Sequence, residues 1–135
     1  MFLFESLLVA MSTYSAIPVP QFEWNDRNMK YAICFFPAVG IFCGTALWGW
    51  SALADSLGIG GFFFAMIATC LPLLITGGIH MDGYMDSVDA LASHQSRERK
   101  LEILKDPNCG AFAVIYCGVY LLAYAGLTHE LFTAN

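Results

Sequence analysis

Long stretches without a charged residue restrict what this chain can fold into. Residues 31–53 and 57–79 are two uncharged apolar runs of 23 residues each, and residues 111–132 form a third run with Glu130 as its one charged side chain. A helix needs about 20 predominantly apolar residues to cross the hydrocarbon core of a bilayer. Only 13% of the residues are charged, against about 25% in soluble domains. We therefore expect an integral membrane protein with transmembrane helices at these runs, and a kink at Pro72.

The amino-terminal apolar segment is shorter than the other three. Residues 2–17 are apolar apart from Glu5 and a few hydroxyl side chains, and Pro18 and Pro20 follow. Proline removes a backbone donor and restricts the residue before it, so a helix is expected to end there. This helix either crosses the bilayer at a tilt or lies partly in the interface. The expected fold class is an all-α, polytopic membrane bundle of about four hydrophobic helices, in a single domain over residues 1–135.

The positive charges indicate how the chain is oriented in the bilayer. All six Lys and Arg residues lie in two connections, at residues 21–30 and 80–110. If the runs at 31–53 and 57–79 form a hairpin, both connections fall on one side of the membrane. Because Lys and Arg are enriched in cytoplasmic loops, we expect this side to be cytoplasmic. Within the second connection, residues 96–105 predict a short interfacial helix.

The composition also argues against several kinds of site and signal. Six cations and a sequence pI of about 4.9 do not provide the basic surface that nucleic acids require. The five cysteines are an odd number and form no CxxC pair, so a thiolate metal site is not expected. The amino terminus lacks a basic segment before its apolar stretch, so no cleavable signal peptide is expected.

Three aspartates at helical spacing are the most distinctive polar feature of the sequence. Asp82, Asp86 and Asp89 lie at positions i, i+4 and i+7, so in a helix they share one face. Carboxylates about 6 Å apart repel by roughly 3 kcal/mol per pair at an effective dielectric constant of about 20. Acids placed this way either face water or hold divalent cations. A role in ion or proton transport and a merely solvated face both stay open beside a metal site.

A metal site for a phosphate-containing substrate accounts for these residues best. Carboxylates are ligands for Mg²⁺, which often takes one or two of them and completes its shell with water and substrate phosphates. Arg97 and Arg99 open the predicted interfacial helix, where the helix dipole disfavours cations, and this placement indicates an anionic partner. His80 is ambiguous, because a general base or a phosphate contact competes evenly with a structural hydrogen bond. The tyrosines at helical spacing in the last run are interpreted mainly as packing: Tyr116, Tyr120 and Tyr124.

The segment TGGIHMDGYMDSVDA at residues 76–90 closely resembles the signature of the cobalamin synthase family, adenosylcobinamide-GDP ribazoletransferase. The similarity extends over most of the chain, at residues 18–20, 36–40, 97–99, 101–106 and 110–112. The acidic segment is also similar in style to that of CDP-alcohol phosphotransferases. The chain lacks their Asp-Gly-x-x-Ala-Arg order, which leaves an enzyme of that kind as the alternative.

The resemblance implies a Mg²⁺-dependent enzyme that joins adenosylcobinamide-GDP to α-ribazole, or to α-ribazole 5′-phosphate, and releases GMP. It implies that Asp82, Asp86 and Asp89 hold the metal. Asp106 would complete the site or act as the base for the incoming hydroxyl, with His80 as a further catalytic candidate. Three basic residues would bind the substrate phosphates: Arg97, Arg99 and Lys105.

The resemblance also implies a setting for the chain. Family members are near twice as long, so the chain is expected to correspond to the amino-terminal half of a longer membrane fold. An oligomer or an additional chain would then complete the corrinoid pocket. The expected location is a prokaryotic cytoplasmic membrane, with the acidic site facing the cytoplasm.

Overall fold

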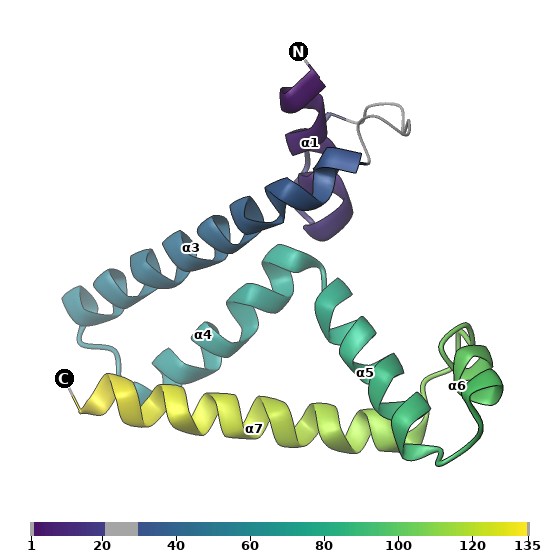
Figure 1. The fold of residues 1–135 in the computed structure, drawn as a ribbon. Helices are drawn as coiled ribbons and strands as arrows, with labels where there is room; N and C mark the ends of the chain where they lie inside the picture. The colour runs from purple at the N-terminus through teal and green to yellow at the C-terminus, as the bar shows by residue number, and fades with distance from the viewer. Residues whose placement is uncertain (1, 21–29, 135) are drawn as a thin grey trace.

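The structure, a computed structural model, describes residues 2–20 and 30–134 (Figure 1). It confirms the all-α fold class, since the described residues contain helices and no strand. The elements are α1 (Phe2–Tyr14), η1 (Ile33–Phe35), α3 (Phe36–Leu57), α4 (Gly61–Thr76), α5 (Ile79–Ala92), α6 (Arg97–Ile103) and α7 (Ala111–Thr133). Most of the connection predicted at 21–30, including Arg27, lies outside the described residues.

Among the residues that the structure describes, two helical stretches are long and apolar enough to cross a membrane alone. They are Lys30–Leu57, with 28 residues, and α7, with 23. Helix α1 has 13 residues and, at a rise of about 1.5 Å per residue, extends roughly 20 Å, which is less than the bilayer core. The backbone N–H of Ala16, just after α1, donates to the carbonyl of Ile75 over 2.8 Å and so ties this segment to the end of α4.

The helix expected at residues 57–79 differs from a single straight span. Helix α4 ends at Thr76, and Gly77 and Gly78 both adopt the left-handed conformation, with φ of 63° and 79°. Helix α5 then starts at Ile79 in a new direction, 93° from α4. The break therefore falls at the two glycines, where positive φ carries no Cβ penalty, and not at Pro72, which lies inside α4.

The bent pair of α4 and α5 runs from one end of α7 to the other (Figure 1). At the start of α4, a methyl group on Gly61 would lie 2.6 Å from Thr133 in the last turn of α7. At the end of α5, Asp89 accepts hydrogen bonds from the first turn of α7. Because α7 extends roughly 34 Å, a pair that spans its length traverses the same thickness. This arrangement favours one broken span over a re-entrant loop.

Aromatic packing holds α3, α4 and α7 together near the carboxyl-terminal end of α7. The indole N–H of Trp50 in α3 donates to the carbonyl of Phe64 in α4 over 3.1 Å. The ring of Phe64 stacks on that of Phe132 in α7, with centroids 3.8 Å apart. The small side chains of Ala54 and Ala68 are buried in the same cluster and permit close helix packing.

Candidate functional site

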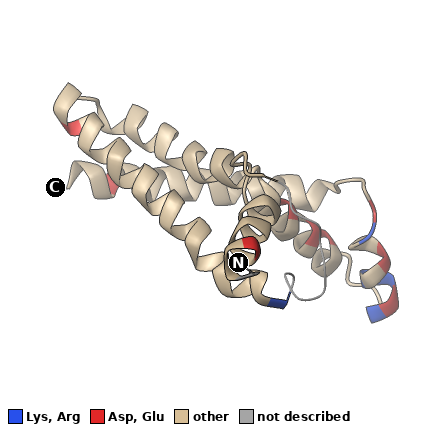
Figure 2. Ribbon diagram, turned by 90° about the horizontal axis from the view of Figure 1, so that it is seen from above, with Lys and Arg blue, Asp and Glu red and all other residues tan. Residues whose placement is uncertain are grey.

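The three aspartates lie on one face of a regular helix, as their spacing predicts. Helix α5 covers Ile79–Ala92 without interruption, so Asp82, Asp86 and Asp89 follow one another along one side. Figure 2 shows charged residues gathered at the end of the molecule that carries α5 and α6, with few at the end beside the carboxyl terminus. The acidic and basic segments thus belong to the same end of the bundle.

The Asp89 side chain is hydrogen-bonded to the start of α7. Its carboxylate accepts hydrogen bonds from the backbone N–H of Gly110 over 2.5 Å and from that of Ala113 over 2.8 Å. Gly110 is the N-cap position of α7 and has no side chain to cap the helix, so a residue of α5 supplies the cap. The negative charge also complements the helix dipole. The third acid of the pattern therefore fastens α5 to α7.

Asp82 and Asp86 are placed differently. Neither carboxylate makes a hydrogen bond or an ion pair with any described residue; Asp82 is exposed and Asp86 is half-buried. Asp82 borders an open cavity of about 540 Å³ beneath the bend, beside Gly77, Gly78 and Met85. These two carboxylates are one helical turn apart and are available to a ligand.

Cys109 lies in the combined field of these acids. Burial raises the pKa of its thiol, and the charges of Asp89, Asp86 and Asp82 raise that pKa further. Because like-sign repulsion disfavours a thiolate there, the thiol stays protonated at neutral pH. The three aspartates thus place negative charge along α5, from its first turn to the contact of Asp89 with the start of α7.

The donor set fits a hard cation held partly by its substrate, and does not form a complete protein cage. Among residues 2–20 and 30–134, no three His, Cys, Asp or Glu side chains are placed to hold one metal ion together. Mg²⁺ commonly needs only one or two carboxylates when phosphates and water supply its other ligands. Asp82 and Asp86 meet that requirement, while Asp89 already accepts two backbone hydrogen bonds.

His80 sits apart from the acidic face. Positions two apart in a helix differ by about 200°, so His80 points away from Asp82. Its imidazole stacks on Tyr14, with centroids 6.3 Å apart, and meets the edge of Phe36 at 5.3 Å. This environment is an aromatic contact between α5, α1 and α3. The structure gives His80 a packing role, and its catalytic role stays a prediction.

The basic residues are displayed on the short helix α6 and its flanks. Ser96 caps α6 by accepting the N–H of Arg99 over 3.4 Å, and the guanidinium of Arg99 pairs with Glu102 at 2.5 Å on the surface. Arg97 and Lys105 are exposed. Within the part of the chain that the structure describes, no ion pair joins these cations to the aspartates of α5. The predicted phosphate clamp is thus near the acids in sequence and not bound to them.

Asp106 forms its own local turn after α6. One of its carboxylate oxygens accepts the backbone N–H of Asn108 over 2.9 Å and the side-chain amide of Asn108 over 2.7 Å. These bonds, with a smaller contribution from Arg99, lower the pKa of the Asp106 carboxyl. A lowered pKa makes the carboxylate a weaker base, so this geometry suits a ligand or turn residue better than the predicted base.

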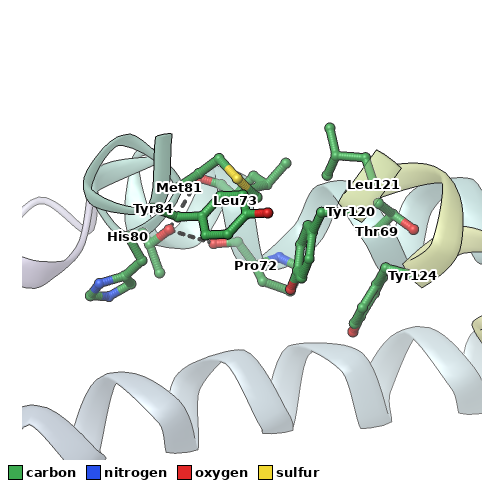
Figure 3. A pocket seen from close by; sticks show the side chains of 10 residues that line it. Thr69, Pro72, Leu73, His80, Met81, Tyr84, Tyr120, Leu121 and Tyr124 are labelled. Atoms are coloured by element: carbon green, nitrogen blue, oxygen red, sulfur yellow. Dashed lines mark hydrogen bonds between the residues drawn. The ribbon is translucent and has the colours of Figure 1, made fainter. Parts of the chain in front are cut away.

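The structure contains a second cavity that the sequence did not predict (Figure 3). It has a volume of about 330 Å³ and lies between α4, α5 and α7, where it is lined by Tyr84, Tyr120 and Tyr124 among others. The four-residue spacing of Tyr120 and Tyr124 was a visible signal, but it indicates packing equally well. That Tyr84 joins them depends on the bend between α4 and α5.

Comparison with known proteins identifies relatives of the whole chain. The family model described as cobalamin-5-phosphate synthase matches residues 6–134. A protein of Lachnoclostridium phytofermentans named adenosylcobinamide-GDP ribazoletransferase is 50% identical over 126 residues, which cover 93% of this chain and 48% of the relative. Proteins of the same name from Clostridium perfringens and Desulfitobacterium hafniense are 37% and 39% identical, over 92% and 86% of this chain. No solved structure gives a significant match. The chain spans about half the length of the curated relatives it matches.

Proposed function

Because the chain belongs to the cobalamin-5-phosphate synthase family, we propose that it carries the phosphate-transfer site of an adenosylcobinamide-GDP ribazoletransferase. In this reaction a hydroxyl of α-ribazole, or of α-ribazole 5′-phosphate, attacks the phosphorus attached to cobinamide. The bond from that phosphorus to the bridging oxygen breaks, GMP leaves with the oxygen, and the hydroxyl proton passes to a base. The step belongs to assembly of the nucleotide loop of cobalamin.

One observation carries the proposal: the carboxylates of Asp82 and Asp86 stand one turn apart on α5, without a partner among the described residues, and Asp82 borders an open cavity. Carboxylates held this way would bind Mg²⁺ together with the diphosphate of the substrate. When bound, the cation would neutralise charge on the phosphate oxygens and on the leaving GMP. Asp89 would act mainly by fixing the direction of α5 against α7, which sets the position of the two free carboxylates.

Basic residues would complete the recognition of the diphosphate. Arg97, Arg99 and Lys105 lie at the same end of the bundle as the acids. Arg99 would exchange Glu102 for a phosphate. Little free energy is lost when this ion pair breaks, because exposed ion pairs contribute only about 0–1 kcal/mol. We place this end at the cytoplasmic side, where the Lys and Arg residues favour it and where nucleotides are available.

The test is an assay of membranes that carry the chain, supplied with adenosylcobinamide-GDP, α-ribazole and Mg²⁺. Formation of the corrinoid product and GMP is expected, with loss of both in Asp82→Asn. A second arm co-expresses the unmatched half of the Lachnoclostridium relative, because the chain covers 48% of that protein. Activity only in the second arm would assign the missing part of the pocket to another chain. No product in either arm, with the full-length relative active alongside, would refute the proposal.

A further inference from the structure

The tyrosine-lined cavity between α4, α5 and α7 has no role in the chemistry of the aspartates. We propose that it binds the planar aromatic base of the nucleoside acceptor, a proposal that rests on the ribazoletransferase function proposed above. Its volume of about 330 Å³ is at the lower end of the range of small-molecule pockets, about 300–1,000 Å³. Figure 3 shows the rings of Tyr84 and Tyr120 facing this space, with Tyr124 beyond them.

The three rings form an aromatic wall drawn from two helices. The centroid of Tyr84 in α5 lies 5.8 Å from that of Tyr120 in α7, which lies 6.1 Å from that of Tyr124. Tyr84 is 37% exposed and Tyr120 46%, and both line the cavity, so part of each side chain is accessible to a ligand. A flat heteroaromatic ring can stack on such faces whatever its substituents, because every base has a π-face.

The hydroxyl groups give a second reason to expect a polar aromatic ligand. None of the hydroxyls of Tyr84, Tyr120 and Tyr124 forms a hydrogen bond with another residue that the structure describes. Tyr120 is the tenth of 23 residues in α7, near the middle of a membrane-spanning helix. A tyrosine hydroxyl in apolar surroundings normally finds a partner, whereas Phe would serve for packing alone. A ring nitrogen of a heteroaromatic base can accept such a bond.

The position of the cavity connects it to the acidic face. Leu73 and Met81 border both this cavity and the one that contains Asp82. The two spaces therefore adjoin across a pair of apolar side chains, one of them a flexible methionine. A nucleoside whose base occupied the tyrosine cavity would extend its ribose past Leu73 and Met81 toward the carboxylates.

The experiment measures binding of benzimidazole, a fused heteroaromatic ring without ribose or phosphate, to the full chain in detergent by equilibrium dialysis. Micelles without protein provide the blank. Tyr120→Leu removes the ring face and keeps an apolar side chain, while Tyr120→Phe keeps the face. Tyr116→Leu is the matched control, because Tyr116 is one turn away on α7, is exposed, and does not line the cavity.

Saturable binding is expected, with affinity lowered about tenfold in Tyr120→Leu, less in Tyr120→Phe, and unchanged in Tyr116→Leu. This result supports the base subsite whether or not transfer is detected, since absent transfer counts against the proposed function alone. Equal affinity in the wild type and Tyr120→Leu would overturn the inference. The absence of saturable binding would also overturn it. Loss of binding when the remaining half of a relative is co-expressed would overturn it too, because it would show that the other half fills the cavity.

Discussion

The carboxylate of Asp89 and the backbone N–H of Gly110, 21 positions apart in sequence, are joined by a hydrogen bond of 2.5 Å. With the second bond to Ala113, this contact makes an aspartate of α5 the N-terminal cap of α7. The acidic pattern therefore divides into one residue that positions the helix and two that remain free. Asp89→Ala should lower stability as the loss of a cap does, by about 1–2 kcal/mol.

Gly110 should tolerate no side chain. A Cβ at this position would lie 2.6 Å from one carboxylate oxygen of Asp89 and 2.7 Å from the other. Gly110→Ala is expected to displace the carboxylate and lower the free energy of unfolding by about 1–3 kcal/mol, measured by thermal or denaturant unfolding in detergent. Gly118→Ala, on the same helix, is the control, since nothing lies within 4 Å of its Cβ. There the higher helix propensity of Ala should stabilise the chain. Equal effects of the two substitutions would contradict the capping contact.

Substitution of Asp82 or Asp86 should reduce activity without reducing stability, unlike substitution of Asp89. Neither carboxylate has a hydrogen-bond or ion-pair partner among the described residues, and each repels the other at i, i+4. Asp82→Asn or Asp86→Asn should leave stability unchanged or raise it by about 0.2–0.5 kcal/mol. Transfer activity should fall at least tenfold, with a higher Mg²⁺ concentration needed for half-maximal rate. A destabilised Asp82→Asn chain would show instead that this residue is structural.

The break at Gly77–Gly78 should depend on both glycines, but unequally. Each has a positive φ, so an alanine at either position costs roughly 1–2 kcal/mol in backbone strain. At Gly77 the new Cβ would also lie 3.2 Å from the Cβ of Ala16, whereas nothing lies within 4 Å at Gly78. Gly77→Ala should therefore unfold at lower denaturant concentration than Gly78→Ala, and Ala16→Gly should remove the difference. A difference that persists in the double variant would exclude the Ala16 contact as its cause.

The turn after α6 should loosen only in acid. The pKa of Asp106 is lowered below its ordinary value of 3.8, chiefly by hydrogen bonds from Asn108. Its contribution to the stability of the turn is therefore complete above pH 3.8. It is lost as the pH falls through the lower, folded-state pKa. Limited proteolysis should find residues 94–110 unchanged between neutral pH and about pH 5, and more readily cut at strongly acid pH. Asp106→Asn should show no such pH dependence; a transition near neutral pH in the wild type would require a different group.

Local features of this chain could be predicted from its sequence, while contacts between distant residues could not. The helices and the shared face of Asp82, Asp86 and Asp89 follow from periodicity, which acts over a few residues. The kink predicted at Pro72 is wrong; the bend occurs at Gly77 and Gly78, whose residue type permits a helix break, beside the segment after α1. The capping role of Asp89 depends on Gly110, which the intervening α6 brings back to α5. Neither contact leaves a signal in local spacing.

Whether α4 and α5 cross the membrane can be tested by finding the side from which an impermeant reagent reaches the residues that flank the pair. Residues 30–57 end on one side, and α4 begins there with Gly61 against the last turn of α7. If α4 and α5 form one broken span, Gln95 returns to the side of Lys30. A re-entrant loop would instead leave it on the side of Ser56.

Cysteines placed singly at Ser56 and Gln95, in a chain whose native cysteines are replaced by alanine, report these two sides to an impermeant maleimide on sealed vesicles. Both positions are exposed, so both should react once the vesicles are opened. We expect Ser56→Cys and Gln95→Cys to be labelled from opposite sides, with Gln95→Cys on the cytoplasmic one. Labelling from the same side would make the pair a re-entrant loop. The carboxylates of α5 would then open to the side opposite Lys30, which would contradict a cytoplasmic site.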